Sequence, residues 1–198
     1  QLGVDPWRWA RDKGREPMDP DSAFARWRRD EMQRVATQSR DCVDYPTTTP
    51  MGAAFVAAAL HNIVNARLVG ECRRLYAENA RVHAAARPEL DGVENITRFF
   101  LDLLGTVPDA RLSVDYSCAN SMRPGDHVAL RWTLAGTHAG AALWGEPSGA
   151  PLLIIGESQY RIEDDKVVEE WLVFDQLAVL TQIERHRTGG ATKSAPED

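Results

Sequence analysis

The sequence predicts an α+β fold in which about three helices cover a curved antiparallel sheet, with a helical arm at the N-terminus. Three observations lead to this prediction. Apolar residues recur at helical spacing between positions 51 and 107, the period falls to two after Pro108, and residues 1–50 differ from both parts in composition. Helices followed by a run of strands are typical of a sheet covered on one face.

The first 50 residues indicate two helices and a linker. Asp5 followed by Pro6 marks one helix start, and Asp19 followed by Pro20 marks a second. Residues 44–50, DYPTTTP, cannot sustain a helix and are predicted to be the linker. The first 40 residues carry nine basic and seven acidic side chains, so their charge is +2 against −8 for the remainder. We interpret this arm as an appendage that packs on something, such as another copy of the domain. The second helix has an apolar stripe at helical spacing, formed by Phe24, Trp27, Val35 and the aliphatic part of Arg28.

Residues 51–107 are predicted to form helices around one short strand. Two helices, broken near residues 65–67, precede a strand at 80–85, and a third helix covers 88–107, where Gly105 can end it. The inward faces of these helices consist of Phe55, Leu60, Val64, Leu68, Cys72 and Leu75, and of Ile96, Phe99, Phe100, Leu103 and Leu104.

Four strands are predicted after Pro108, at residues 111–121, 126–138, 151–162 and 166–177. Gly125–Asp126 and Asp164–Asp165 mark turns, and residues 140–150 form a longer loop. The sequence therefore predicts three parts: the arm and linker at 1–50, a domain at 51–184, and a disordered tail at 185–198.

Composition excludes several classes of protein. The 198 residues, 43% hydrophobic and 26% charged, suit one compact domain with some additional chain. The net charge of −6 and the scattered Lys and Arg residues argue against nucleic acid as a partner. No apolar run approaches the roughly 20 residues that cross a bilayer, and the first residues lack the apolar core of a signal peptide, so no membrane partner and a cytoplasmic location are predicted. Three cysteines without a CxxC spacing argue against a disulfide framework and a zinc site, and no metal is expected.

Several phrases resemble one protein family. LYAENARVHAA (75–85), GDHVALRWTLAGTHAG (125–140) and KVVEEWLVFDQLAVLTQI (166–183) occur in the same order in the SnoaL-like polyketide cyclase (ester cyclase) family, which has the nuclear transport factor 2-like cone fold. The patterns RWTxxGTHxG and EEWxxxDxxxL are the most diagnostic. The resemblance covers about residues 51–183 and implies a cone-shaped sheet around a hydrophobic cavity for a small apolar or polyketide-like molecule. It also implies cofactor-free aldol closure of a polyketide ester, and a homodimer paired through the open sheet face.

The first residues raise a further hypothesis. QLGVDPW resembles the segment after the last strand of this family, where a helix often ends in a QLG-type phrase. The chain could therefore begin at the tail of a preceding, similar domain. A chance match of three letters is the equal alternative.

Asp175 is the predicted acid/base. Side chains alternate along a strand, so Trp171, Val173 and Asp175 share one face, which we expect to line the cavity. A carboxylate in a dry pocket loses hydration, so its neutral form is favoured and it can accept and return a proton. The resemblance assigns the same role to this aspartate. The alternative is that Asp175 caps the final helix as an acceptor, and both roles can hold at once.

The other candidate site residues are His83, His138, Trp132, Trp171 and Tyr160. The resemblance matches His83 to a cavity histidine that could hold a substrate carbonyl as an enolate develops. A histidine satisfied by a backbone carbonyl is the alternative. His138 ends the 126–138 strand and is expected near the substrate or in a structural role. Trp132 and Trp171 are expected in the cavity wall.

One departure from the family concerns the strand at 151–162. Members with demonstrated chemistry often carry a histidine there, and none occurs in this chain between His138 and His186. Tyr160 shares a face with Ile154, Gly156 and Ser158, so it could supply a hydroxyl instead.

Three functions remain open at this point. The first is a lyase or isomerase that abstracts a proton next to a carbonyl. The second is a non-catalytic module that binds an apolar ligand or serves in dimerisation. The third, an epoxide-opening hydrolase on the same fold, needs a carboxylate–water–Arg/Asn cluster that cannot be located in the sequence.

Overall fold

The protein is described by a computed structural model that covers residues 5–16, 18–47, 52–84, 88–121 and 126–191. The α-helices are α1 (Pro6–Gly14), α2 (Ala23–Ala36), α3 (Ala53–Val64), α4 (Cys72–Leu75), α5 (Val93–Thr106) and α6 (Gln176–Ala191), with a 3-10 turn, η1 (Val69–Glu71), before α4. The strands are β1 (Tyr76–Ala84), β2 (Leu90–Asp91), β3 (Arg111–Ser121), β4 (Asp126–Thr137), β5 (Pro151–Glu163) and β6 (Lys166–Phe174).

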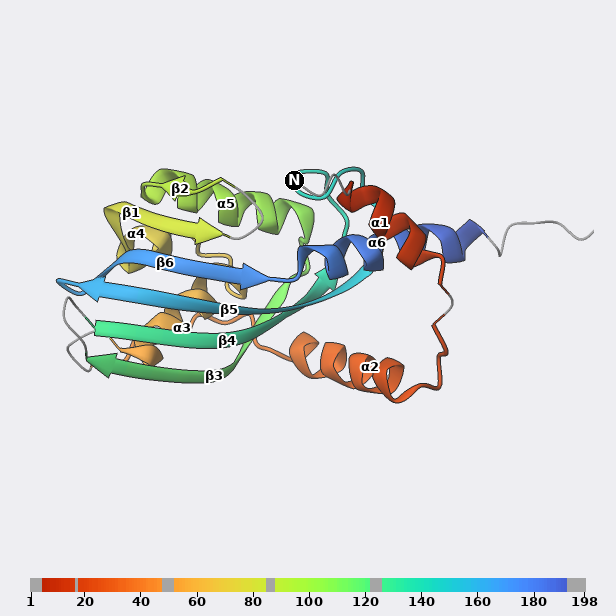
Figure 1. Cartoon of the computed structure of the whole chain (residues 1–198). Helices are drawn as coiled ribbons and strands as arrows, with labels where there is room; N and C mark the ends of the chain where they lie inside the picture. The colour runs from red at the N-terminus through yellow and green to blue at the C-terminus, as the bar shows by residue number, and fades with distance from the viewer. Residues whose placement is uncertain (1–4, 17, 48–51, 85–87, 122–125, 192–198) are drawn as a thin grey trace, which may run out of the picture.

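The six strands form one open, curved sheet in the order β2-β1-β6-β5-β4-β3 (Figure 1). Strands β3 to β6 are a meander of antiparallel neighbours, as predicted. The expectation of a purely antiparallel sheet needs one correction, because β1 pairs with β6 in parallel. Strand β1 precedes the meander in the chain and enters the sheet beside its last strand, in the same direction.

Helices α3 and α5 cover the inner face of the sheet, and the main core lies between these layers. The predicted α+β cone is therefore confirmed. Its largest fully buried apolar side chains include Ile63, Leu75, Tyr76, Ile96, Leu130, Leu134 and Tyr160. The predicted second helix before the first strand is reduced to η1 and the short α4. None of the helices in the described ranges combines the length and the apolar character that a membrane crossing needs.

The N-terminal arm packs on its own domain. Helix α1 lies alongside α6 (Figure 1), so closely that a Cβ on Gly14 would come within 2.9 Å of Glu184 Cβ. Helix α2 lies on the outer face of the sheet, where Val35 forms a small second core with Ala135 and Leu153. The sequence predicts one apolar packing stripe on this helix, but only part of it is buried. Val35 is buried, while Phe24 and Trp27 are exposed.

Polar contacts hold α2 in place. The guanidinium of Arg34 donates to Ser113 Oγ at 2.8 Å and to Asp115 Oδ1 at 2.7 Å, both on β3. Arg28 donates from Nη2 to the Pro151 carbonyl at 2.7 Å and to Gln182 Oε1 at 2.9 Å. The arm is thus tied to β3, β5 and α6 by charge-assisted hydrogen bonds.

Several predicted boundaries differ from the structure. The strand predicted at 80–85 begins at Tyr76, the helix predicted at 88–107 begins at Val93 after the short strand β2, and the strand predicted at 166–177 ends at Phe174. Helix α2 is capped by Ser22, whose Oγ accepts from Ala25 N at 3.1 Å, while Asp19 accepts from Asp21 N in the preceding turn. Helix α6 continues to Ala191, so residues 185–191 of the predicted tail are helical. Residues 192–198 and residues 48–50 of the linker lie outside the described ranges, and 44–47 have no helix or strand.

Candidate functional site

A small apolar cavity lies between the inner face of the sheet and helices α3 and α5. Its free volume is about 60 Å³. Strands β4, β5 and β6 supply one wall, and the helices supply the other. The lining residues are Leu60, Val64, Val82, Ile96, Phe99, Phe100, Leu103, Leu112, Trp132, Leu134, Leu143, Trp144, Ile154, Ser158, Tyr160, Glu170, Leu172 and Phe174.

Strand alternation brings the polar members of this lining together. Tyr160 on β5 lies opposite Glu170 on β6 in the ladder, and Ser158 is two residues before Tyr160, so the three side chains share the inner face. Trp132 on β4 lies opposite Gly156, and a Cβ at position 156 would come 2.2 Å from the indole. Gly156 therefore leaves the space that Trp132 occupies, from which Trp132 Nε1 donates to Ser158 Oγ at 3.2 Å.

Glu170 is a carboxyl buried in this apolar cavity, with 5% of its surface exposed. Tyr76 Oη donates to Glu170 Oε2 at 2.6 Å, and the hydroxyls of Ser158 and Tyr160 lie close enough to the carboxyl to lower its pKa. Burial raises the pKa of Glu170 because the charged form loses hydration, and the three hydroxyl donors offset part of that effect. Burial also raises the pKa of Tyr76 and Tyr160 well above the ordinary value, so both remain neutral donors.

This arrangement can move a proton. Glu170 is the only carboxyl or amine in the cavity lining within the described residues. A carboxyl whose pKa is shifted toward the working pH can accept a proton in one step and return it in another. Neutral hydroxyls beside it can hold a developing negative charge on oxygen.

The loop between β4 and β5 closes one side of the cavity. Leu143 and Trp144 of this loop line it, and Trp144 has φ +56°, a left-handed conformation that is strained for a bulky residue. The Trp144 ring contacts Phe174 edge-on, with ring centres 6.5 Å apart. Thr106, at the end of α5, accepts from the backbone of Ala139 and Gly140 and so holds the start of the loop.

His138 holds the same loop and does not line the cavity. It is fully buried, its Nδ1 lies 2.9 Å from Ser148 Oγ, and its carbonyl accepts from Ser148 and Gly149. Burial lowers the pKa of His138, so the ring is neutral. Of the two roles open from sequence, the geometry fits the structural one.

The structure places Asp175 outside the cavity. Asp175 is exposed, its Oδ1 accepts from Ala178 N at 2.9 Å, and it therefore caps α6. The expectation that Trp171, Val173 and Asp175 face the hollow is wrong, since Trp171 and Val173 are 38% and 55% exposed. The opposite set of β6, Glu170, Leu172 and Phe174, faces inward. Both faces of this strand carry large apolar side chains, so the period of two does not decide which is buried.

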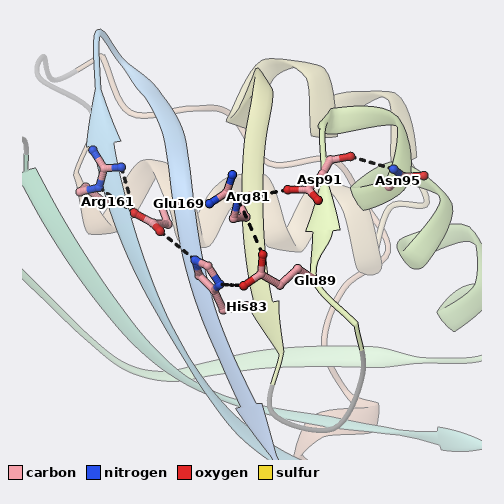
Figure 2. Close-up of polar contacts among 7 residues, drawn as sticks. All are labelled: Arg81, His83, Glu89, Asp91, Asn95, Arg161 and Glu169. Atoms are coloured by element: carbon pink, nitrogen blue, oxygen red, sulfur yellow. Dashed lines mark hydrogen bonds and ion pairs between the residues drawn. The ribbon is translucent and has the colours of Figure 1, made fainter.

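His83 and Trp171 also lie on the outer face. Figure 2 shows the His83 ring between two carboxylates, with Nδ1 2.8 Å from Glu89 Oε1 and Nε2 2.7 Å from Glu169 Oε1. The hydrogen bond to Glu169 raises the pKa of His83, and Glu89 adds to the effect. The Trp171 ring stacks on His83 at 5.5 Å. Neither residue lines the cavity.

Tyr160 and Trp132 lie in the cavity wall, on the strand faces expected from sequence. Sequence reasoning missed Glu170, Tyr76 and Ser158. An inward Tyr160 indicates that the residue opposite it on β6 also points inward, but the register of the hairpin decides whether that residue is Glu169 or Glu170. Within the described ranges, no group of three or more His, Cys, Asp and Glu side chains is arranged to hold a metal ion.

Comparisons with known proteins agree with this architecture. A profile described as SnoaL-like polyketide cyclase matches residues 54–183. No protein among the curated sequences matches the chain. A presumed SnoaL-like polyketide cyclase from Jannaschia sp. CCS1 has a similar structure, with a TM-score of 0.58 and 20% identity over 70% of this chain and 97% of that one.

Two further solved structures are similar. IdmH from Streptomyces antibioticus, a presumed polyketide cyclase, has a TM-score of 0.51 and 25% identity over 64% of this chain and 94% of its own. A protein with a ketosteroid isomerase-like fold from Catenulispora acidiphila, solved in complex with trimethylamine, has a TM-score of 0.51 and 18% identity over 68% of this chain and 93% of that one. These identities support a shared fold.

Proposed function

This chain belongs to the SnoaL-like polyketide cyclase family, and from that premise we propose that it catalyses proton transfer next to a carbonyl group of a small apolar molecule. The reaction is an aldol-type ring closure of a polyketide-like ester. The observation that carries the proposal is the buried carboxyl of Glu170, which shares an apolar cavity with neutral hydroxyl groups.

In this proposal Glu170 takes the acid/base role that the family resemblance suggested for Asp175. Ionised Glu170 removes an acidic proton from the carbon between two carbonyl groups, and the electron pair of that C–H bond forms an enolate. The enolate carbon then forms a C–C bond to the carbon of a further carbonyl group, elsewhere in the same molecule. The electron pair of that C=O moves to its oxygen, which takes the proton back from Glu170, so no proton is gained or lost. The hydroxyl of Tyr160 is the donor for the enolate oxygen.

Substrate entry requires the cavity to open. A free volume of about 60 Å³ is well below the roughly 300–1,000 Å³ of ordinary ligand pockets. The irregular segment of the wall is the β4–β5 loop with Leu143 and Trp144, so we propose that this loop moves to admit the substrate.

The proposal is tested by Glu170→Gln, which keeps the shape and removes the proton acceptor. With a β-keto ester that the wild type converts, we expect kcat to fall by about 10²–10⁴, the usual contribution of a general base. Glu169→Gln is the matched control, since it changes the neighbouring carboxyl on the outer face. Asp175→Asn is the second control, and both should keep kcat within about threefold of wild type. Unchanged turnover in Glu170→Gln, or lost turnover in Asp175→Asn with an intact fold, would exclude the proposed role of Glu170.

A non-catalytic module that binds an apolar ligand is the second candidate. The exposed position of Asp175, away from this cavity, favours it. It predicts that an apolar ligand quenches the fluorescence of Trp132 and Trp144, in the cavity wall, while no β-keto ester is converted by wild type or by Glu170→Gln.

We also propose that the protein is a homodimer. Ile155, Trp171 and Val173 on the outer face of β5 and β6 are large apolar side chains that are 43%, 38% and 55% exposed. Their position on one face of adjacent strands supports pairing through the open side of the sheet.

A further inference from the structure

A second hollow lies outside the cone, between the N-terminal arm and helix α6. It is a groove with a free volume of about 890 Å³, within the range of ligand pockets. Helix α1 and helix α6 form one side, α2 forms the other, and β5 contributes the floor. The close approach of α1 to α6 at Gly14 and the hydrogen bonds of Arg28 to β5 and α6 fix these elements relative to one another.

The groove is lined by exposed aromatic side chains that do not belong to the hydrophobic core. Trp9, Phe24 and Trp27 are 38%, 58% and 42% exposed. Phe24 and Trp27 lie side by side on α2 with ring centres 5.7 Å apart. Exposed aromatic side chains gathered around a concave surface are typical of a binding site.

Two guanidinium groups lie together in the same groove. Arg28 and Arg185 are close enough for repulsion from Arg185 to lower the pKa of Arg28, after the larger effect of burial. Arg28 bonds only to neutral oxygens, those of Pro151 and Gln182. Arg185 has one long contact, 3.5 Å from Nη2 to the Lys13 carbonyl, and its buried Nε has no hydrogen-bond partner.

The carboxylates of the groove do not neutralise this pair. Glu16 is paired with Lys13 at 2.6 Å, and Asp175 caps the first turn of α6. Asp175 lies ten residues from Arg185 along that helix, about 15 Å away at 1.5 Å per residue. Among the described lining residues, three lysine and arginine side chains (Lys13, Arg28, Arg185) face two carboxylates (Glu16, Asp175), a formal surplus of one positive charge. An anion bound between the two guanidinium groups would offset their repulsion and give the buried Nε of Arg185 an acceptor.

We propose that this groove binds a small amphipathic anion, a molecule with an apolar body and a carboxylate head. The head pairs with Arg28 and Arg185, and the body lies against Trp9, Phe24 and Trp27. This site is separate from the Glu170 cavity and does not depend on the proposed catalytic function.

The test compares octanoate with octan-1-ol by isothermal titration calorimetry on the full chain. The two probes share the apolar body and differ in the charged head. We expect octanoate to bind at least about tenfold more tightly at low salt, because a charge-assisted hydrogen bond contributes more than a neutral one. The preference should shrink as salt is added. Equal affinities for the two probes, or no binding of octanoate, would overturn the proposal.

Substitutions of single residues test whether octanoate binds in this groove. Arg185→Gln should weaken octanoate binding about tenfold and leave octan-1-ol binding unchanged, while Arg185→Lys, which keeps the charge, should retain part of the preference. Arg8→Gln removes the same charge from an exposed position on α1 outside the groove and should change neither affinity. Trp27→Ala should weaken the binding of both probes. Octanoate binding that is unaffected by Arg185→Gln in a folded protein, or a dimer that Arg185→Gln dissociates, would contradict a small-molecule site here.

Discussion

At the scale of single residues, two neighbouring glutamates of β6 have opposite environments. Glu170 points into the apolar cavity, where burial raises its pKa. Glu169 points to the outer face, where the hydrogen bonds from His83 and then Arg161 lower its pKa. The two environments differ because successive side chains of a strand point to opposite faces. A substitution of one glutamate is therefore a control for the same substitution of the other.

The Glu170 carboxyl should make the protein less stable as pH rises. A carboxyl whose pKa is higher in the folded than in the unfolded state binds more protons when folded. Between those two pKa values the free energy of unfolding therefore falls with rising pH. We expect the stability of Glu170→Gln relative to wild type to increase from about pH 4.5 upward, measured by urea unfolding at several pH values. Glu169→Gln should not show this rise, because the lowered pKa of Glu169 stabilises the wild type above about pH 4.5. A pH-independent difference for Glu170→Gln would show that the carboxyl is not desolvated.

The His83 contacts predict a second pH dependence. Both ring nitrogens face carboxylates (Figure 2), and only the protonated ring can donate to both. The other charged groups around this cluster are Arg81 on the same strand, Asp91 on β2, and Arg161 on β5 beyond Glu169. A raised folded-state pKa means that the stabilisation is complete below the unfolded value of about 6.5 and is lost as pH rises through the folded value.

The measurement is the free energy of unfolding of wild type and His83→Gln between pH 5 and pH 9. The difference should be largest near pH 5–6 and should shrink above about pH 6.5. A His83→Gln difference that grows with pH would contradict a protonated ring between the two glutamates.

At the scale of elements, the packing of β4 against β5 depends on a glycine. Gly156 leaves room for the Trp132 indole in the cavity wall. Gly156→Ala should lower the free energy of unfolding by about 1–3 kcal/mol through overpacking, measured by urea unfolding. Gly105→Ala is the control: it has open space around its Cβ in the last turn of α5, so helix propensity should leave it equal to wild type or up to about 1 kcal/mol more stable. Equal effects of the two substitutions would mean that Trp132 can move aside.

In the β5–β6 hairpin, the strands and the turn could be predicted from the sequence, but the pairing register could not. Its strands were predictable from their period, and the turn at Asp164–Asp165 from its residue types, which adopt positive φ there. A two-residue turn with regular pairing would place Glu169 opposite Tyr160 and would turn Trp171, Val173 and Asp175 inward. The ladder instead shifts by one residue between Ile162 and Arg161, so that Tyr160 faces Glu170.

This bulge inverts every later side chain of β6. Nothing in the local sequence marks it, because Val167 and Val168 fit either register. The cone and Tyr160 could therefore be predicted from sequence, while the identity of the buried carboxyl could not. The docking of the arm was equally hidden, since it depends on Arg28 and Arg34 reaching partners more than 70 positions away in the sequence.

At the scale of the whole molecule, the arm covers only part of the outer face. Helix α2 packs over β3, β4 and Leu153 of β5, whereas Ile155, Trp171 and Val173 on β5 and β6 remain exposed. Val173→Lys should convert the proposed dimer into a monomer, because a charge at the centre of an apolar interface is left without hydration. Light scattering measures the mass. Leu101→Lys is the control, since Leu101 is an equally exposed apolar residue on α5, in the helical layer. A wild type that is monomeric at micromolar concentration, or a dimer that survives Val173→Lys, would exclude this interface.

The parallel pairing of β1 with β6 has a consequence for synthesis. Arg81 on β1 pairs with Glu169 on β6. During translation, β1 therefore cannot complete its pairing until the last strand of the domain has been synthesised. Contacts so far apart in the chain form late and slowly. When β1 to β5 have left the ribosome and β6 has not, the edges of β1 and β5 that will pair with β6 are unpaired. A chaperone or another nascent chain can bind these edges until β6 emerges and pairs with both.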